Sequence, residues 1–141
     1  MNLNEHLLIV LSEECTEIIE LIVDGGNVKD EVNDLMGCYE LSIEEKMFPK
    51  ITDYNNKIIS NYEIMKHLLK VQYFISKSLR FGLNECYPGS HTRNYDEILT
   101  NLTPVFSRFK SILDPELIEN KKSKIKHFIG FSIQNECLKI D

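Results

Sequence analysis

Five acidic residues near the start of the chain have a spacing that could bind divalent metal ions. Glu13, Glu14 and Glu17 stand at positions i, i+1 and i+4, so on a helix all three project from one side within about a turn. Glu31 and Asp34 are three residues apart and share a face of a second helix. Apolar residues flank both groups, which places the carboxylates toward the interior of a helical hairpin.

Carboxylates that face one another in a partly buried place repel. Burial and like charge both raise their pKa values unless cations neutralise them. Several hard oxygen ligands suit Mg²⁺ or Mn²⁺ rather than zinc. The alternative is that both groups are solvated faces, as acidic residues on helices usually are. The spacing alone does not decide between a metal site and a solvated acidic surface.

The elements that must position these residues are helices, because apolar residues recur at steps of three and four and no segment alternates as a strand would. Five helices are predicted, which makes the fold class all-α. They run from Leu3 to Asp24-Gly25-Gly26, from after Asn27 to near Pro49, and over about 55–81, 94–112 and 115–136. Pro104 is expected to kink the fourth helix, and Asp114 is the predicted N-cap of the fifth.

Length and composition limit the class of protein. The 141 residues fit one compact domain, and 43% hydrophobic content can fill a single core. The net charge of −6 opposes sequence-independent binding to nucleic acid or to an anionic membrane, which needs clustered Lys and Arg. No apolar run is long enough to span a bilayer and no secretory signal is found, so we expect a cytoplasmic protein. The cysteines form no CxxC pair and are expected to be reduced: Cys15, Cys38, Cys86 and Cys137.

The acidic residues belong to longer segments with a family pattern. Leu11-Ser12-Glu13-Glu14-Cys15-Thr16-Glu17-Ile18, followed by Lys29-Asp30-Glu31-Val32-Asn33-Asp34-Leu35, resembles the EExxE…ExxD signature of the all-α nucleoside triphosphate pyrophosphatases, the MazG-like and dimeric dUTPase-like group. Three further segments are similar to small phage-type members: Asn4 to Leu8, Lys77 to Leu83 with Tyr87-Pro88-Gly89, and Leu117 to Lys124. By this resemblance the fold is a MazG-like bundle with a four-helix core and a C-terminal helix.

The resemblance implies an enzyme, a Mg²⁺-dependent hydrolase that cleaves a nucleoside triphosphate to the monophosphate and diphosphate, with Mn²⁺ able to replace Mg²⁺. It implies metal ligands at Glu13, Glu14, Glu17, Glu31 and Asp34, with Glu13 or Glu14 acting on the attacking water. Lys77 and Arg80 would contact phosphates, although cations near a helix C-terminus are equally explained by the helix dipole. Tyr87 would stack on a base, whereas Phe81 is assigned to the core.

The order of the motifs departs from that of simple family members. In those, the EExxE helix runs directly into a segment like Ser76 to Gly82, which here lies far downstream. We explain this by an internal duplication within a single domain: 1–50 as the metal-binding hairpin, 54–113 as a degenerate second hairpin and 114–141 as the C-terminal helix. Such an arrangement is similar to tandem dimeric dUTPases. The other interpretation is a divergent hairpin that resembles the first only by composition.

If the halves are duplicates, the second half has lost its acidic ligands. Its three EExxE positions fall on Lys66, His67 and Lys70. The ExxD pair is replaced by Ile98 and Asn101, or by Glu97 and Thr100, depending on a shift of one residue. Metal binding is therefore expected only in the first half. The three basic positions are either an anion site or a solvated basic face.

Two predictions about partners follow from the resemblance. The partner is a nucleotide, with no nucleic acid polymer and no membrane. The chain is also expected to form a homo-oligomer, a dimer or tetramer, because family members assemble and the last helix is apolar: Ile118, Ile125, Phe128, Ile129 and Ile133. The rival functions are a catalytically weak or inactive nucleotide-binding protein and a helical interaction module. The base and sugar of the nucleotide depend on pocket shape, which spacing does not supply.

Overall fold

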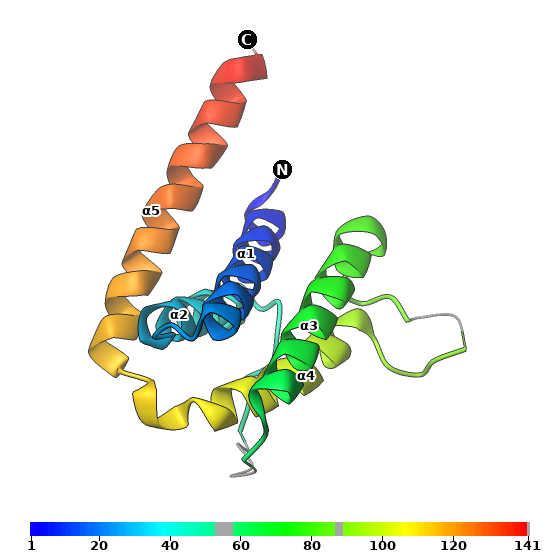
Figure 1. The fold of residues 1–141 in the computed structure, drawn as a ribbon. Coiled ribbons are helices and arrows are strands. Elements are labelled where there is room, and N and C mark those ends of the chain that lie inside the picture. The colour runs from blue at the N-terminus through cyan, green and yellow to red at the C-terminus, as the bar shows by residue number, and fades with distance from the viewer. Residues whose placement is uncertain (53–57, 87–88, 141) are drawn as a thin grey trace.

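The computed structural model is built from helices, in the order α1 (Leu3–Asp24), α2 (Lys29–Glu44), α3 (Asn61–Phe81), α4 (Asn94–Arg108), the 3-10 turn η1 (Lys110–Ile112) and α5 (Pro115–Ile140). The structure describes residues 1–52, 58–86 and 89–140, with side chains as far as residue 134. Within these residues no β-strand forms, and one isolated antiparallel bridge joins Cys86 to Arg93. The predicted all-α class with five helices is confirmed (Figure 1).

The turn between α1 and α2 forms where the sequence predicts it. Gly25 adopts φ 74°, and the Gly25 and Gly26 N–H groups donate to the Ile22 and Leu21 carbonyls at 3.2 and 2.8 Å. This pair of bonds satisfies carbonyls that the end of a helix leaves unpaired, and the left-handed conformation favours glycine. The Asn27 side chain then accepts from the Lys29 N–H at 2.9 Å and starts α2. The short turn holds α1 and α2 together as a hairpin.

Two predicted helix boundaries are wrong. α2 ends at Glu44 instead of near Pro49, because Lys46 adopts φ 59° and the chain turns Met47 and Phe48 into the core. α3 begins at Asn61 instead of about residue 55, where the Ser60 hydroxyl accepts from the Glu63 N–H at 3.2 Å. Residues 58–60 are not helical, and 53–57 lie outside the described residues.

The last two helices follow the prediction more closely. α4 continues through Pro104 to Arg108, and the predicted remainder is the 3-10 turn η1. Asp114 is the N-cap of α5, since its Oδ1 accepts from the Glu116 and Leu117 N–H groups at 3.1 and 3.4 Å. α5 extends to Ile140, beyond the predicted end at Glu136.

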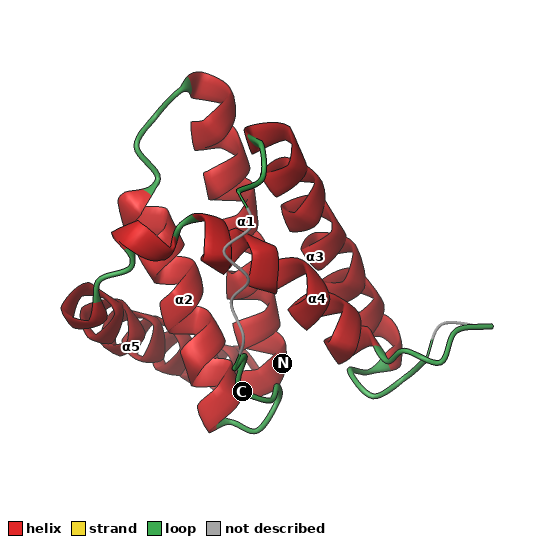
Figure 2. Ribbon diagram, turned by 90° about the horizontal axis from the view of Figure 1, so that it is seen from below, coloured by secondary structure: helices red, strands yellow, loops and turns green. Residues whose placement is uncertain are grey.

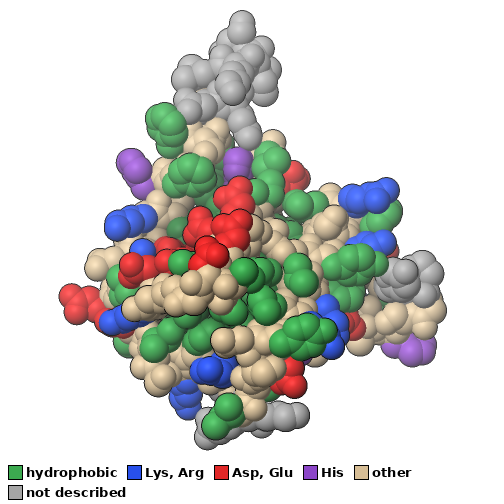
Figure 3. Space-filling view, in the orientation of Figure 1, with side chains coloured by type: hydrophobic (Ala, Val, Ile, Leu, Met, Phe, Trp, Pro, Cys, Tyr) green, Lys and Arg blue, Asp and Glu red, His purple; other side chains and the backbone are tan. Residues whose placement is uncertain are grey.

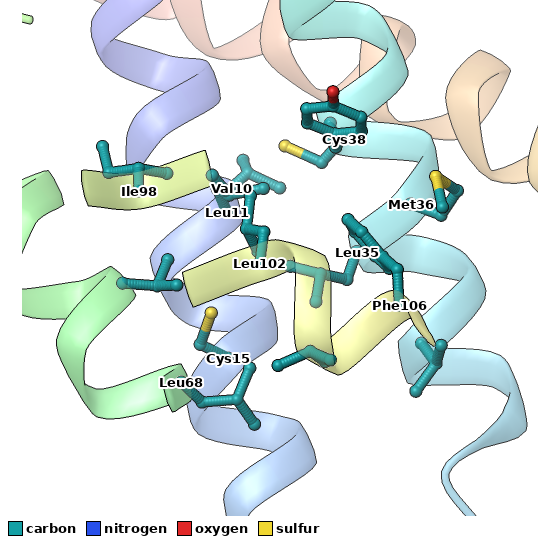
Figure 4. Close-up of a cluster of buried hydrophobic side chains, with 14 of the residues drawn as sticks. Val10, Leu11, Cys15, Leu35, Met36, Cys38, Leu68, Ile98, Leu102 and Phe106 are labelled. Atoms are coloured by element: carbon teal, nitrogen blue, oxygen red, sulfur yellow. The ribbon is translucent and has the colours of Figure 1, made fainter. Parts of the chain in front are cut away.

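The helices form two hairpins with α5 beside the first. α1 packs against α2 and α3, α3 packs against α4, and α5 packs along α2 (Figures 1 and 2). Figure 4 shows the core between the hairpins, where Leu11 and Cys15 of α1, Leu35 of α2, Leu68 of α3 and Leu102 of α4 meet. All five side chains are fully buried. Burial of this apolar surface fixes the angle at which α1 and α2 present their acidic residues.

α5 uses most of its apolar residues within the chain. Ile118, Ile125 and Ile129 are buried and Ile133 packs against the core, so these side chains are not displayed to a partner. Phe128 stays 57% exposed, and Phe131, one turn further on, is 59% exposed. The C-terminal end of α5 projects beyond the other helices (Figure 1). Within the described residues, no helix combines the length and the apolar character needed to cross a membrane.

Candidate functional site

The α1–α2 hairpin brings four of the five predicted acidic residues together: Glu14, Glu17, Glu31 and Asp34. The pKa of Glu14 is raised to about 8, chiefly by burial, and also by the charges of Asp34, Glu17 and Glu31 and by a hydrogen bond to Glu17. We call these four residues the acidic cluster. Figure 3 shows acidic side chains gathered over this hairpin.

The two members of the cluster on α2 are perturbed in the same direction. Burial is the largest cause that raises the pKa of Glu31, and it is also the largest cause that raises the pKa of Asp34. The charge of Glu17 adds to both effects. When carboxylates are partly buried close to one another, each makes it less favourable for the others to carry a charge. A bound cation would relieve this repulsion.

Two oxygen atoms of the cluster lack partners. Glu14 Oε2 and Glu31 Oε2 are buried and have no hydrogen-bond partner among the described residues. A buried oxygen without a partner is costly, and in native proteins it usually has an explanation such as an ion or water. Carboxylate oxygens are the ligand type that Mg²⁺ and Mn²⁺ prefer. The ligand atoms of the acidic cluster are therefore of the chemical type that a hard divalent cation binds.

The side chains do not converge on one point as the structure places them. Within the described part of the chain, no group of three or more His, Cys, Asp or Glu side chains is arranged to hold a metal ion. The opening beside the cluster is an open pocket of about 270 Å³, lined by Glu17, Glu20, Leu21, Asp24 and Glu31. Glu20 and Asp24 extend the acidic surface along α1 toward the turn, a feature that the sequence motif does not mark.

Glu13 is the one predicted ligand that lies elsewhere. Its exposed side chain lines a pocket of about 180 Å³ between α1 and α3, with Ser12, Gln72 and Ser76 among its neighbours. Adjacent helical residues point about 100° apart, so Glu14 meets α2 while Glu13 meets α3. Gln72 holds these helices together, because its Nε2 donates to the Ser12 carbonyl at 2.8 Å and to Thr16 Oγ1 at 2.6 Å.

The structure adds a cation that sequence reasoning missed. Lys121 Nζ of α5 lies 3.5 Å from Asp34 Oδ2, and the Lys121 side chain is only 16% exposed. Its charge and hydrogen bond oppose the rise in the Asp34 pKa, although burial still outweighs them. Lys121 belongs to the C-terminal segment that resembles the family, but no local pattern says that this segment packs against α2.

The predicted phosphate-binding residues lie on α3 against its aromatic side chains. Lys77 Nζ is 5.5 Å from the Tyr73 ring centroid and 5.6 Å from that of Phe81, and the Arg80 guanidinium is 5.1 Å from Phe81. Phe81 is 55% exposed, so its assignment to the core is wrong. Phe81 is the last residue of α3, and the last buried residue of this helix is Ser78. Tyr87 lies outside the described residues.

The second hairpin has a polar contact where the first has carboxylates. His67 Nδ1 of α3 lies 2.9 Å from Asn101 Oδ1 of α4, and Asn101 is buried. Lys66 lies over the Tyr62 ring at 5.6 Å, and both Lys66 and Lys70 are exposed. The duplication itself stays a prediction.

The cysteine side chains that the structure describes are free thiols. Cys15 and Cys38 are free and buried, and burial raises the pKa of each thiol well above its usual value. Cys86 is free and exposed, whereas the side chain of Cys137 lies outside the described residues.

Comparison of the chain with protein-family models, curated proteins and solved structures finds no match in any of the three.

Proposed function

We propose that this chain is a Mg²⁺-dependent nucleoside triphosphate pyrophosphohydrolase that releases diphosphate and a nucleoside monophosphate. The observation that carries this proposal is the acidic cluster, in which carboxylates from two helices face one another and two of their buried oxygens lack partners. The EExxE…ExxD pattern supports it independently, because the clustered residues are those that the resemblance assigns to metal. The enzyme would act on free cytoplasmic nucleotides as a homo-oligomer.

The acidic cluster would bind the metal through its carboxylate oxygens: Glu14, Glu17, Glu31 and Asp34. When bound, Mg²⁺ supplies neutralisation of phosphoryl oxygens and a water of lowered pKa. Because burial and the neighbouring carboxylates raise the pKa of Glu14, a cation would compete with a proton at this residue. Glu13 stays a proposed water-orienting residue, and it faces the separate opening between α1 and α3. Lys77, Arg80 and Tyr87 remain the proposed nucleotide contacts.

A pyrophosphate-release assay with Mg²⁺ over a panel of canonical, deoxy and modified nucleoside triphosphates tests the function. We expect turnover with at least one nucleotide, complete loss in EDTA and recovery with Mn²⁺. Orthophosphate release in place of pyrophosphate would contradict the reaction. The absence of turnover across the panel, at any Mg²⁺ concentration, would contradict the enzyme.

A second candidate is a nucleotide-binding or sequestering protein without turnover. The specific observation in its favour is that the carboxylates do not converge and that Lys121 already neutralises part of the Asp34 charge. Such a protein would show a rise in melting temperature with nucleotide, because a ligand that binds only the native state stabilises it. A thermal shift without pyrophosphate release would therefore favour sequestration over hydrolysis. No shift with any nucleotide would favour an interaction module instead.

A further inference from the structure

α5 is fixed against α2 beside the acidic cluster by contacts at two points. At the first, the buried Asn33 side chain donates to the Ile112 carbonyl at 3.0 Å and accepts from the Asp114 N–H at 2.9 Å. At the second, Gly37 leaves room for close approach, since a Cβ there would lie 3.4 Å from the Ile118 carbonyl oxygen and from Lys121 Cβ. The start of α5 and the base of the Lys121 side chain are therefore both held against α2.

The next lysine of α5 strengthens the same packing. Lys122 Nζ lies 2.7 Å from Glu44 Oε1 and 3.9 Å from Glu40 Oε2, both on α2, and 3.3 Å from Glu119 Oε1. Its side chain is only 12% exposed. These carboxylates satisfy Lys122 and hold the helix in register. Lys121 is thereby directed to the other side of Gly37, where Asp34 Oδ2 lies 3.5 Å away.

We propose that Lys121 is the resident counter-cation of the acidic cluster, and that a divalent metal ion must displace it from Asp34 in order to bind. This inference rests on the proposed function, because it assumes that the cluster takes Mg²⁺. It assigns a role to a residue on α5 that the EExxE…ExxD pattern does not include. Two cations of like sign cannot both lie against one carboxylate without repulsion, so the lysine lowers the affinity of the cluster for metal.

This competition has a functional consequence. With Lys121 at Asp34, free Mg²⁺ alone binds weakly, whereas a metal ion that arrives with a triphosphate brings anionic oxygens to which the displaced ammonium group can turn. Metal loading is then coupled to arrival of the nucleotide. The coupling requires only that the Lys121 side chain move, because the backbone of α5 is held by Asn33 and Lys122.

The test measures Mg²⁺ binding by isothermal titration calorimetry in metal-free buffer without nucleotide. We expect Lys121→Met to bind Mg²⁺ about tenfold more tightly than the unmodified chain, because the competing charge beside Asp34 is gone. Lys121→Gln keeps a hydrogen-bond donor for Asp34 and should show the same tightening, so it replaces the Met variant if that one folds poorly. Lys121→Arg keeps the charge and should stay within about threefold of the unmodified chain.

Lys126→Met is the matched control. It removes one lysine from the same helix and breaks an ion pair to α2, since Lys126 Nζ lies 3.7 Å from Glu44 Oε2, away from the cluster. The net charge changes equally in both variants, so a general increase in the attraction of Mg²⁺ would appear in both. Tightening confined to the Lys121 variants supports local competition at Asp34.

The outcomes separate this inference from the proposed function. Equal or weaker Mg²⁺ binding in Lys121→Met and Lys121→Gln overturns the counter-cation, while the metal site itself stands. Tighter Mg²⁺ binding in these variants supports the counter-cation. If the unmodified chain also releases no pyrophosphate from any nucleotide, the hydrolase is overturned while the counter-cation stands. If none of the proteins binds Mg²⁺, the counter-cation is overturned, and the pyrophosphate-release assay of the unmodified chain with Mg²⁺ and nucleotide decides the hydrolase separately.

Discussion

Glu14→Gln should stabilise the metal-free protein at alkaline pH. The folded pKa of Glu14 is about 8, against a usual value of 4.5, so the folded state binds a proton that the unfolded state has lost. Stability from this group is therefore full below pH 4.5 and falls as the pH rises from about 4.5 to about 8. Glutamine has the same shape but does not ionise, so the variant escapes this loss.

The size of the effect follows from the same shift. A fully buried group would lose about 1.4 kcal/mol per pH unit over that window, but Glu14 is partly solvated and shares charge with its neighbours, so we expect about 1–2 kcal/mol. For a chain of this length that corresponds to a rise in melting temperature of roughly 3–8 °C. Both proteins should melt at closely similar temperatures near pH 4.5.

Thermal unfolding followed by circular dichroism in EDTA, at pH 5 and pH 8.5, measures this difference. Glu116→Gln is the control, because Glu116 is exposed on α5 and belongs to no carboxylate cluster. Its melting temperature should follow that of the unmodified chain at both pH values. If Glu14→Gln melts below the unmodified chain at pH 8.5, or shows the same pH dependence, Glu14 does not carry the repulsion inferred from the structure.

Three further predictions concern catalysis, the docking of α5 and assembly. Glu14→Gln and Asp34→Asn should each lower the rate of pyrophosphate release by at least about a hundredfold, and unchanged rates in both would exclude the acidic cluster as the metal site. Asn33→Ala leaves buried partners on η1 and at the start of α5 unsatisfied, so urea denaturation should show a loss of about 2–4 kcal/mol; an unchanged midpoint would mean that α5 docks without it. If exposed aromatic rings on α5 form an oligomer contact, light scattering should give a multiple of the 16.5 kDa chain mass, and Phe128→Ser with Phe131→Ser should reduce it to one chain. A single-chain mass before mutation would end that proposal.

The sequence predicts those features of the fold that depend on neighbouring residues. Asp24-Gly25-Gly26 ends α1 because local carbonyls and a left-handed glycine decide the turn, and Asp114 caps α5 because a cap reaches only three residues ahead. The end of α2 was not predictable in this way. It depends on Met47 and Phe48 entering a core built from distant helices.

The acidic cluster was predictable only in part, for a similar reason. The spacing places Glu14 and Glu17 on one face of α1 and Glu31 and Asp34 on one face of α2, and the hairpin then brings the four together. Whether a residue faces α2 or α3 depends on tertiary packing, and this separates Glu13 from its neighbour. Lys121 shows the limit more clearly, because its role depends on α5 packing against Gly37 and the sequence pattern gives no sign of that approach.

The two hairpins offer a physical reason why chemistry would be confined to the first. In the second hairpin His67 Nδ1 and Asn101 Oδ1 lie 2.9 Å apart, and the Asn101 Nδ2 also donates to the Glu97 carbonyl at 2.7 Å. These groups are satisfied without a ligand. In the first hairpin, Glu14 and Glu31 each keep a buried oxygen without a partner, and burial, with like charge added, raises their pKa values. The polar contact of the second hairpin needs no ligand, whereas a bound cation would relieve the repulsion in the first. The unpaired oxygens and the repelling carboxylates therefore lie in the hairpin where the proposed metal would bind, and the other hairpin has a polar contact at its centre.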